Sequence, residues 1–238
     1  KIIKYWEEKM STAEEIYKKI LNIFFIILLI ALLCIAGYIA YKFISAKIIN
    51  DDSEEYIAEF ENEIGELEEN VINDETVTEQ ESQEDTNVNN KAKKVNKARK
   101  SKTKKSVKKY YNYDICGYIR IPKTGIKYPI ISTLSKQALE KGVCVEYGPG
   151  PNEPGNTVIA GHNYLNRLFF SKNKNLNIGD KVYVTDLYGV TVEYTIYNKF
   201  ETSPQDTNYM FRDTGGVPEI TLATCSQNGS ARLILYAK

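Results

Sequence analysis

The sequence predicts one mostly β domain, a sandwich or a barrel, preceded by a single membrane-spanning helix and a charged stalk. Three observations carry this prediction. An apolar run lies near the beginning of the 238-residue chain, and the charged side chains that follow it are segregated by sign. Residues 110–238 consist of short β-rich segments separated by glycine and proline. A single large soluble enzyme is excluded, because only these last residues have the mixed composition of a folded domain.

The apolar run covers residues 20–44 and contains no charge before Lys42. About 20 apolar residues cross a hydrocarbon core of about 30 Å, so the run is long enough for a transmembrane signal anchor. Five lysines precede it and only two closely follow it. The positive-inside rule then places residues 1–19 in the cytoplasm and the rest of this single-pass chain outside the cell membrane. A cleaved signal peptide is the alternative, with Ala36-Gly37 as a weak cleavage site.

Residues 45–109 are predicted to form a charged stalk, helical or disordered. Residues 51–90 carry 16 acidic and no basic side chains, and residues 91–109 carry 11 basic and no acidic ones. Such blocks lack the apolar surface that offsets the entropy of a folded chain. We therefore expect a spacer whose contacts with the following domain are mostly electrostatic and screened by salt. Outside the cell the basic block suits anionic wall polymer or lipid headgroups, and nucleic acid is not an expected partner.

One pattern inside the stalk is apolar. Ile57, Phe60, Ile64, Leu67 and Val71 are spaced by three and four residues, which is the seam pattern of a coiled coil. The pattern lasts about two heptads, fewer than the three or four that make a coiled coil a firm prediction. A solvated helix that continues from the membrane span is therefore the favoured interpretation, and a coiled coil is the alternative.

The domain at 110–238 contains seven segments with the composition of strands. One helical stretch, 134–141, interrupts them and stops at Gly142. The residues 186–189 between two of the segments, Asp-Leu-Tyr-Gly, favour a hairpin. The predicted strands cover 115–121, 127–131, 157–160, 181–185, 190–200, 219–223 and 232–237.

Candidate catalytic residues stand at the ends of two of these segments. The only histidine of the chain, His162, comes directly after Thr-Val-Ile-Ala-Gly, and Cys225 ends Ile-Thr-Leu-Ala-Thr-Cys. A nucleophilic thiol needs a partner that takes its proton and later protonates a leaving amine, and imidazole does both near neutral pH. Arg232 begins the next segment, so antiparallel pairing would return it beside Cys225. There it could stabilise an oxyanion but could not act as a base.

Taken singly, these residues have structural explanations. A lone histidine at a strand end is usually a structural or surface group, a lone cysteine a small core residue, and an arginine a surface charge. One histidine and one cysteine are too few for a zinc site. Cys116 and Cys144 could form a disulfide, but their spacing in the sequence does not decide whether they do. The residues alone thus indicate a Cys/His pair.

Longer motifs carry a resemblance to a known family. The chain reads Gly-Tyr-Ile-Arg-Ile-Pro-Lys at 117–123, Pro-Gly-Asn-Thr-Val-Ile-Ala-Gly-His at 154–162 and Leu-Asn-Ile-Gly-Asp at 176–180. It continues with Thr-Leu-Ala-Thr-Cys at 221–225, with Arg232 seven positions further on. In these motifs residues 114–238 resemble the sortases, the membrane-anchored cysteine transpeptidases of Gram-positive bacteria. The Thr-Leu-x-Thr-Cys signature with its arginine seven positions later is the most specific of them.

The resemblance implies a mostly β fold, an eight-stranded barrel with short helices, and an active site at one rim. It implies Cys225 as nucleophile, His162 as general acid and base, and Arg232 as the group that stabilises the substrate carbonyl and tetrahedral intermediate. Thr224 would help to bind the substrate. The implied reaction cleaves a Leu-Pro-x-Thr-Gly-like sorting signal between Thr and Gly through a thioester. The protein would then pass to an amine of a peptidoglycan precursor or of another surface protein, such as a pilin.

No cofactor is expected. Calcium-dependent sortases have an acidic cluster before the histidine, and here only Glu146, Glu153 and Asp206 are candidates, which is weak support for a hard-cation site. Two other functions compete. A papain-like cell-wall cysteine peptidase would place its cysteine before its histidine, and a non-catalytic stalked receptor or adhesin would not need all three candidate residues. Since every motif lies after Asp114, a chain beginning near Tyr110 is expected to keep the activity.

Overall fold

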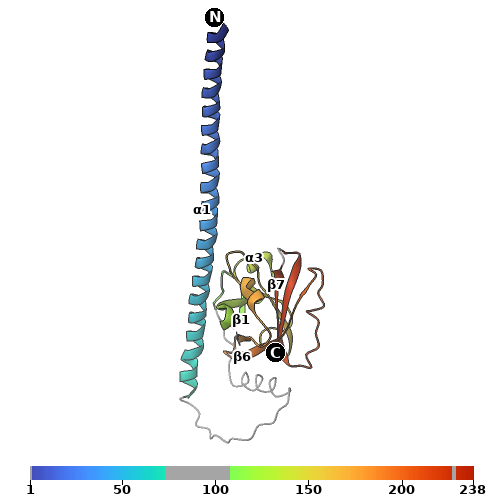
Figure 1. Cartoon of the computed structure of the whole chain (residues 1–238). Coiled ribbons are helices and arrows are strands. Elements are labelled where there is room, and N and C mark those ends of the chain that lie inside the picture. Colours follow the sequence, from blue (N-terminus) through green and yellow to red (C-terminus); the bar gives the residue numbers. More distant parts are fainter. Residues whose placement is uncertain (1, 73–107, 227–228) are drawn as a thin grey trace. The chain divides into compact units, whose positions relative to one another are not determined.

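The structure is a computed structural model that describes residues 2–72, 108–226 and 229–238 (Figure 1). It divides into two compact units, Lys1–Lys47 and Ile48–Lys238. Helix α1 (Ile2–Ile72) supplies the first unit and the beginning of the second.

The first unit is helical. In the described part of the chain, α1 is the one helix long and apolar enough to cross a membrane. Its large apolar side chains, such as Phe24 and Leu33, stand exposed along the predicted span 20–44. An α-helix satisfies its own backbone hydrogen bonds, which allows it to carry such side chains into lipid. The unit therefore has the properties expected of a membrane anchor.

The second unit is built around a closed barrel of eight strands, which confirms the predicted fold class. The strands take the order β1-β2-β3-β4-β7-β8-β6-β5 around the barrel, with β2/β3 and β4/β7 parallel and the other pairs antiparallel. The strands are β1 (Ile115–Ile121), β2 (Ile126–Ile131), β3 (Val143–Tyr147), β4 (Gly155–Ala160), β5 (Lys181–Asp186), β6 (Thr191–Thr202), β7 (Pro218–Ser226) and β8 (Ala231–Ala237). Short helices connect them: η1 (Pro122–Thr124), α3 (Lys136–Leu139) and η2 (Phe170–Asn175).

Alternation along the strands defines the barrel interior. Successive side chains of a strand point to opposite faces. In β1, Ile119 and Ile121 are fully buried and Arg120 between them is exposed. In β6, Tyr194 and Ile196 are likewise fully buried. The interior is therefore filled mostly by apolar side chains, with a few buried polar ones such as Thr221, which donates a hydrogen bond to Asn156 at 2.8 Å.

The predicted hairpin joins β5 to β6. The Asp186 carboxylate accepts hydrogen bonds from the backbone N–H groups of Tyr188 (2.9 Å) and Val190 (3.1 Å). Gly189 adopts φ 71°, in the left-handed region that glycine tolerates best. The turn residues thus fix the register of the two strands, as the sequence indicated.

The sequence did not predict β3, and its helical stretch 134–141 is shorter in the structure. Helix α3 covers only Lys136–Leu139, where the Ser135 hydroxyl accepts a hydrogen bond from the Ala138 N–H at 3.0 Å. Strand β3 is short, and its parallel pairing with β2 covers two residue pairs. A strand of this kind is stabilised by the closure of the barrel, and its own residues give little indication that it will form.

The four cysteines of the chain are all free. Cys144 is buried in the barrel, and burial raises the pKa of its thiol to about 12. The Cys116 thiol donates to the backbone carbonyl of Ile130 at 3.4 Å. The disulfide between Cys116 and Cys144 that the sequence left open is therefore not formed.

Part of the predicted spacer packs against the barrel. Ile57 and Phe60 of α1 are buried, and the Phe60 ring meets the Tyr118 ring of β1 edge-on at 5.6 Å. Polar groups join the contact: the hydroxyls of Ser53 and Tyr110 are 2.9 Å apart, and Tyr118 donates to Glu61 at 2.8 Å. The expectation of mostly electrostatic contacts thus overlooked an apolar contact within residues 53–61.

The reason for this error lies in the heptad-like spacing. Residues three and four apart share one face of a helix, so a few apolar side chains make a continuous stripe even in an acidic segment. That stripe, formed by Ile57 and Phe60, packs against the barrel at Tyr118 of β1. The side chains of Ile64, Leu67 and Val71, which would extend the predicted seam, lie outside the described residues, as do residues 73–107 of the stalk.

The buried stripe predicts a stability effect. Replacing Phe60 by alanine should lower the free energy of unfolding of Ile48–Lys238 by about 3 kcal/mol, because a buried ring is lost. Urea unfolding followed by fluorescence measures this change. The matched control is Glu55→Ala on the exposed face of the same helix, which should change it by less than about 0.5 kcal/mol. Equal stability of the two variants would contradict the docked helix.

Candidate active site

Two parallel strands bring the candidate residues to one rim. β4 and β7 pair in register from Gly155/Pro218 to Ala160/Ala223. The carboxyl ends of parallel neighbours lie at the same edge of a sheet, so the residues just after β4 lie beside the end of β7. His162 comes two residues after β4, and Cys225 lies two residues beyond the last β7 pair. This one strand pairing therefore brings together two residues that lie far apart in the sequence.

Arg232 reaches the same rim through β8. Strands β7 and β8 are antiparallel, and Cys225 stands directly opposite Arg232 in their register. The guanidinium donates a hydrogen bond to the Cys225 sulfur at 3.2 Å. The return of Arg232 to Cys225, predicted from the spacing, is thus observed. A permanent positive charge at this place can stabilise an oxyanion that forms next to the sulfur.

His162 sits in an aromatic environment. Its imidazole stacks on the Tyr164 ring with a centroid distance of 4.5 Å and an interplanar angle of 27°. Its Nε2 atom is buried and has no hydrogen-bond partner within the described residues. Burial lowers the pKa of His162 below its usual 6.5, and the Glu140 carboxylate opposes this shift. Burial and Glu140 also raise the pKa of Tyr164 to about 12, so this phenol stays neutral.

The glycine before His162 is required by packing. A Cβ atom at Gly161 would lie 2.8 Å from the ring of Phe170 in η2, closer than real contacts allow. The Gly161 carbonyl accepts a hydrogen bond from the Thr224 hydroxyl at 2.7 Å, and its N–H donates to the Ala223 carbonyl at 3.1 Å. Gly161 therefore lets the chain pass close to both η2 and β7 just before the histidine.

Thr224 was expected to help bind substrate through its backbone or its hydroxyl. Its side chain is buried, and the hydroxyl donates its proton to the Gly161 carbonyl. A hydroxyl has one donor, so this one is already used within the protein. The side chain joins the two strand ends, and it is not available to donate to a substrate carbonyl.

Glu146 and Tyr209 accompany Arg232. The Tyr209 hydroxyl lies 3.4 and 3.5 Å from the two Glu146 carboxylate oxygens. Burial raises the pKa of Glu146, while Tyr209 and the Arg232 charge lower it. From the sequence, Glu146 was a candidate only as a cation ligand. The structure instead places it with a tyrosine close to the charge of Arg232.

The acidic side chains do not gather into a metal site in the described part of the chain. No three histidine, cysteine, aspartate or glutamate side chains there lie close enough together to hold an ion. Asp206, considered beside Glu146 and Glu153, accepts hydrogen bonds from Thr202 and from the Asn208 backbone. That the reaction needs no cation stays a prediction.

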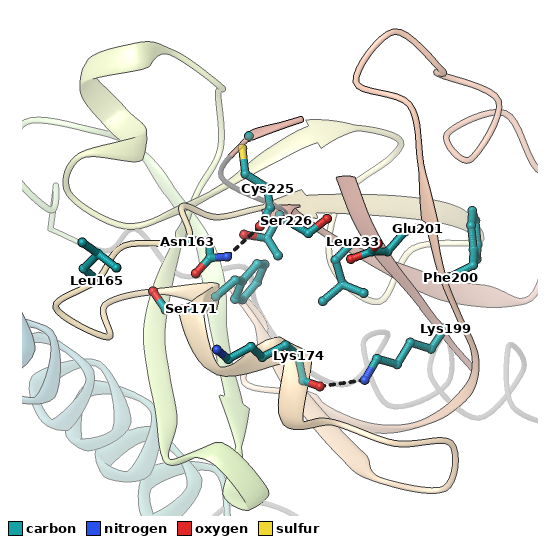
Figure 2. Close-up of a pocket in the computed structure, with 13 residues that line it drawn as sticks. Asn163, Leu165, Ser171, Lys174, Lys199, Phe200, Glu201, Cys225, Ser226 and Leu233 are labelled. Carbon is teal, nitrogen blue, oxygen red and sulfur yellow. Dashed lines mark hydrogen bonds between the residues drawn. The ribbon is translucent and has the colours of Figure 1, made fainter. Parts of the chain in front are cut away.

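A cavity of about 730 Å³ opens beside Cys225 (Figure 2). Its lining combines apolar side chains with three charged ones, Lys174, Lys199 and Glu201. Lys199 is tied to the backbone carbonyls of Lys174 and Leu176, each at 2.7 Å. The lining comprises Asn163, Leu165, Phe170, Ser171, Lys174, Lys199, Phe200, Glu201, Thr224, Cys225, Ser226, Gly229 and Leu233. A cavity of this size and mixed lining suits part of a peptide.

The family model for the sortase domain matches residues 119–238. The chain belongs to the sortase family. Sortases are cysteine transpeptidases in general, and a free cysteine beside an arginine at a barrel rim agrees with that chemistry. No curated protein gives a significant match to this sequence.

Solved sortase structures resemble the fold. A sortase D5 transpeptidase of Clostridium perfringens is 24% identical, with a TM-score of 0.52, over 81% of this chain and 98% of that one. Sortase C1 of Streptococcus suis is 24% identical, with a TM-score of 0.48, over 52% and 72% of the two chains. Sortase A of Listeria monocytogenes is 22% identical, with a TM-score of 0.47, over 52% and 86%. At these identities the likeness concerns the fold alone, and the subclass of this sortase is not decided by it.

Sequence reasoning missed three residues of the sortase site. Asn163 donates from its side chain to the Cys225 carbonyl, Tyr164 stacks on the imidazole, and Tyr209 lies beside Glu146. Asn163 and Tyr164 come directly after the histidine, so their position in the sequence was a usable signal. Tyr209 lies in the connection between β6 and β7, and only the folded chain shows its neighbours.

The environment of His162 predicts its titration. Because burial disfavours the charged imidazolium, the pKa should lie below the ordinary 6.5. Glu140→Gln should lower it further, since the carboxylate stabilises the proton. Proton NMR reports this directly, because the chain has one histidine. Asp213→Asn, which is not among the groups that act on the imidazole, is the matched control and should leave the midpoint unchanged. A midpoint at or above 6.5 in the unmodified chain would refute the assignment.

Proposed function

We propose that this sortase cleaves a Leu-Pro-x-Thr-Gly-like sorting signal between Thr and Gly and transfers the carried protein to an amine. The acceptor would belong to a peptidoglycan precursor or to another surface protein such as a pilin. The observation that carries the proposal is the direct pairing of Cys225 with Arg232 at the rim that also holds His162. Nucleophile, proton carrier and oxyanion stabiliser are the groups that acyl transfer requires.

In the first half-reaction the Cys225 sulfur attacks the threonine carbonyl carbon, and His162 takes the thiol proton. The carbonyl oxygen becomes an oxyanion in the tetrahedral intermediate. Arg232, whose guanidinium lies 3.2 Å from the sulfur, is near enough to donate to that oxygen. The C–N bond then breaks, His162 returns the proton to the departing glycine nitrogen, and a thioester on Cys225 remains.

In the second half-reaction an amine attacks the thioester carbonyl. His162 accepts the proton of the amine, Arg232 again stabilises the oxyanion, and the thiolate of Cys225 leaves and is reprotonated. A new amide bond forms and the enzyme is restored. A thioester reacts more readily with an amine than with water, which favours transfer over hydrolysis. A lowered His162 pKa keeps the imidazole neutral, and therefore able to accept a proton, near neutral pH.

The acyl-transfer test uses synthetic sorting peptides with and without an added amine, with products identified by mass spectrometry. Cys225→Ala should abolish the acyl-enzyme, and His162→Ala should remove nearly all turnover. Arg232→Ala should lower kcat by about 10²- to 10³-fold, the usual effect of removing an oxyanion donor. Arg232→Lys is the matched control, because it keeps the charge but loses the forked donor geometry. Unchanged turnover in Cys225→Ala, with its fold intact by circular dichroism, would overturn the assignment.

The same products separate the competing functions. A cysteine peptidase would release only the free acid whatever amine is added, and a receptor or adhesin would bind peptide without cleaving it. The transpeptidase predicts an amine-dependent amide product as the main one.

The proposed localisation is the cell membrane, with residues 1–19 in the cytoplasm and the barrel outside. Its support is the apolar span of α1 and the excess of lysine before it. Protease added to intact protoplasts should remove the chain beyond residue 44, either in the stalk or after mild unfolding of the barrel. Protection of residues 110–238 under conditions that cut the unfolded domain would reverse the orientation.

A further inference from the structure

The strand pairing that builds the active site ends just before it. The β4/β7 ladder stops at Ala160/Ala223, and the hydrogen bond from the Gly161 N–H to the Ala223 carbonyl is the last between their backbones. Beyond this point two side chains continue the connection. Thr224 donates to the Gly161 carbonyl at 2.7 Å, and the Asn163 amide donates to the Cys225 carbonyl at 2.8 Å (Figure 2).

We propose that Asn163 is a positioning residue, which holds the backbone of Cys225 in place for acylation by way of its side-chain amide. This inference rests on the proposed function, because acylation of Cys225 is its first step. Asn163 is the residue directly after His162, so one hydrogen bond links the backbone segments of the proton carrier and the nucleophile. Neither the family match nor the sequence motifs assign this role.

Asn163 is a firm anchor because its own backbone is fixed on both sides. It forms an isolated bridge with Phe169, a fully buried residue. The His162 carbonyl accepts from the Phe170 N–H at 3.0 Å, and the Tyr164 N–H donates to the Ser171 hydroxyl at 2.8 Å. The amide of Asn163 therefore projects toward Cys225 from a segment that is attached to η2.

The chemistry of the contact favours asparagine. A carboxamide supplies an N–H donor that does not titrate, so the link to the Cys225 carbonyl persists at every working pH. Aspartate has nearly the same shape but is an acceptor when ionised, and it would repel the carbonyl. Alanine removes the contact altogether. A misplacement of about 1 Å at a reacting atom costs about 10²-fold in rate, so a single positional hydrogen bond can matter for catalysis.

The test uses the full chain in detergent micelles, with Asn163→Ala, Asn163→Asp and the matched control Asn166→Ala. The Asn166 side chain lies in the same connection but accepts only a local bond from the Leu168 N–H, at 3.5 Å. Single-turnover acylation by a sorting peptide should be about 10- to 100-fold slower in both Asn163 variants. The KM for the peptide and the melting temperature should stay close to those of the unmodified chain. Asn166→Ala should acylate at the unmodified rate.

A second readout needs no substrate. Hydrogen exchange of the backbone amides at Cys225 and Arg232 should be faster in both Asn163 variants and unchanged in Asn166→Ala. A mere structural bond would lower the melting temperature without a selective loss of acylation rate, and a substrate-binding role would raise KM instead. Either result, or an unmodified acylation rate in Asn163→Ala, overturns the proposal.

Failure of the proposed function gives a different result. In that case the unmodified chain forms no acyl-enzyme with any sorting peptide. The exchange measurement then decides the inference alone: unchanged exchange at Cys225 in both Asn163 variants would refute it, and faster exchange would support the hold on the Cys225 backbone.

Discussion

The parallel pairing of β4 with β7 is the constraint on which the active site depends. It aligns Ala160 with Ala223, so that the two chains leave the sheet side by side and deliver His162 and Cys225 to one rim. The antiparallel partner β8 then places Arg232 directly opposite Cys225. Because the barrel is closed, neither pairing can slip by one residue without turning buried side chains outward. Catalytic geometry and core packing are thus enforced by the same hydrogen-bond ladders.

Local signals account for what the sequence could predict. The Asp186–Gly189 turn, the alternating β1 and the spacing from Cys225 to Arg232 each depend on nearby residues, and the structure has all three. β3 depends on barrel closure, and the neighbours of Tyr209 depend on where a long connection packs, so neither could be read locally. The prediction of an eight-stranded barrel came from the family resemblance of the motifs, since strand composition alone did not distinguish a sandwich from a barrel.

The acidic segment after the membrane span illustrates a second limit. The apolar pattern of Ile57 and Phe60 is visible in the sequence, but the many acidic side chains over 51–90 favoured a solvated helix over one that packs on the barrel. What decides whether a helix packs is the arrangement of apolar side chains on one face and not their overall share. Ser53 and Glu61 then use the same face for hydrogen bonds to Tyr110 and Tyr118. Composition described the polarity of this segment correctly but did not predict its contacts.

Closure of the barrel also limits how a substrate can be recognised. β1 pairs with β5 and β2, so the described strands close into a ring that has no edge strand. Closure leaves an extended peptide little room to bind by adding a strand to the sheet, a mode in which main-chain hydrogen bonds supply affinity with little regard to sequence. Recognition must come from side chains and connecting segments at the rim. A sortase with this barrel gains selectivity among extended polypeptides, because their backbones alone find little to bind.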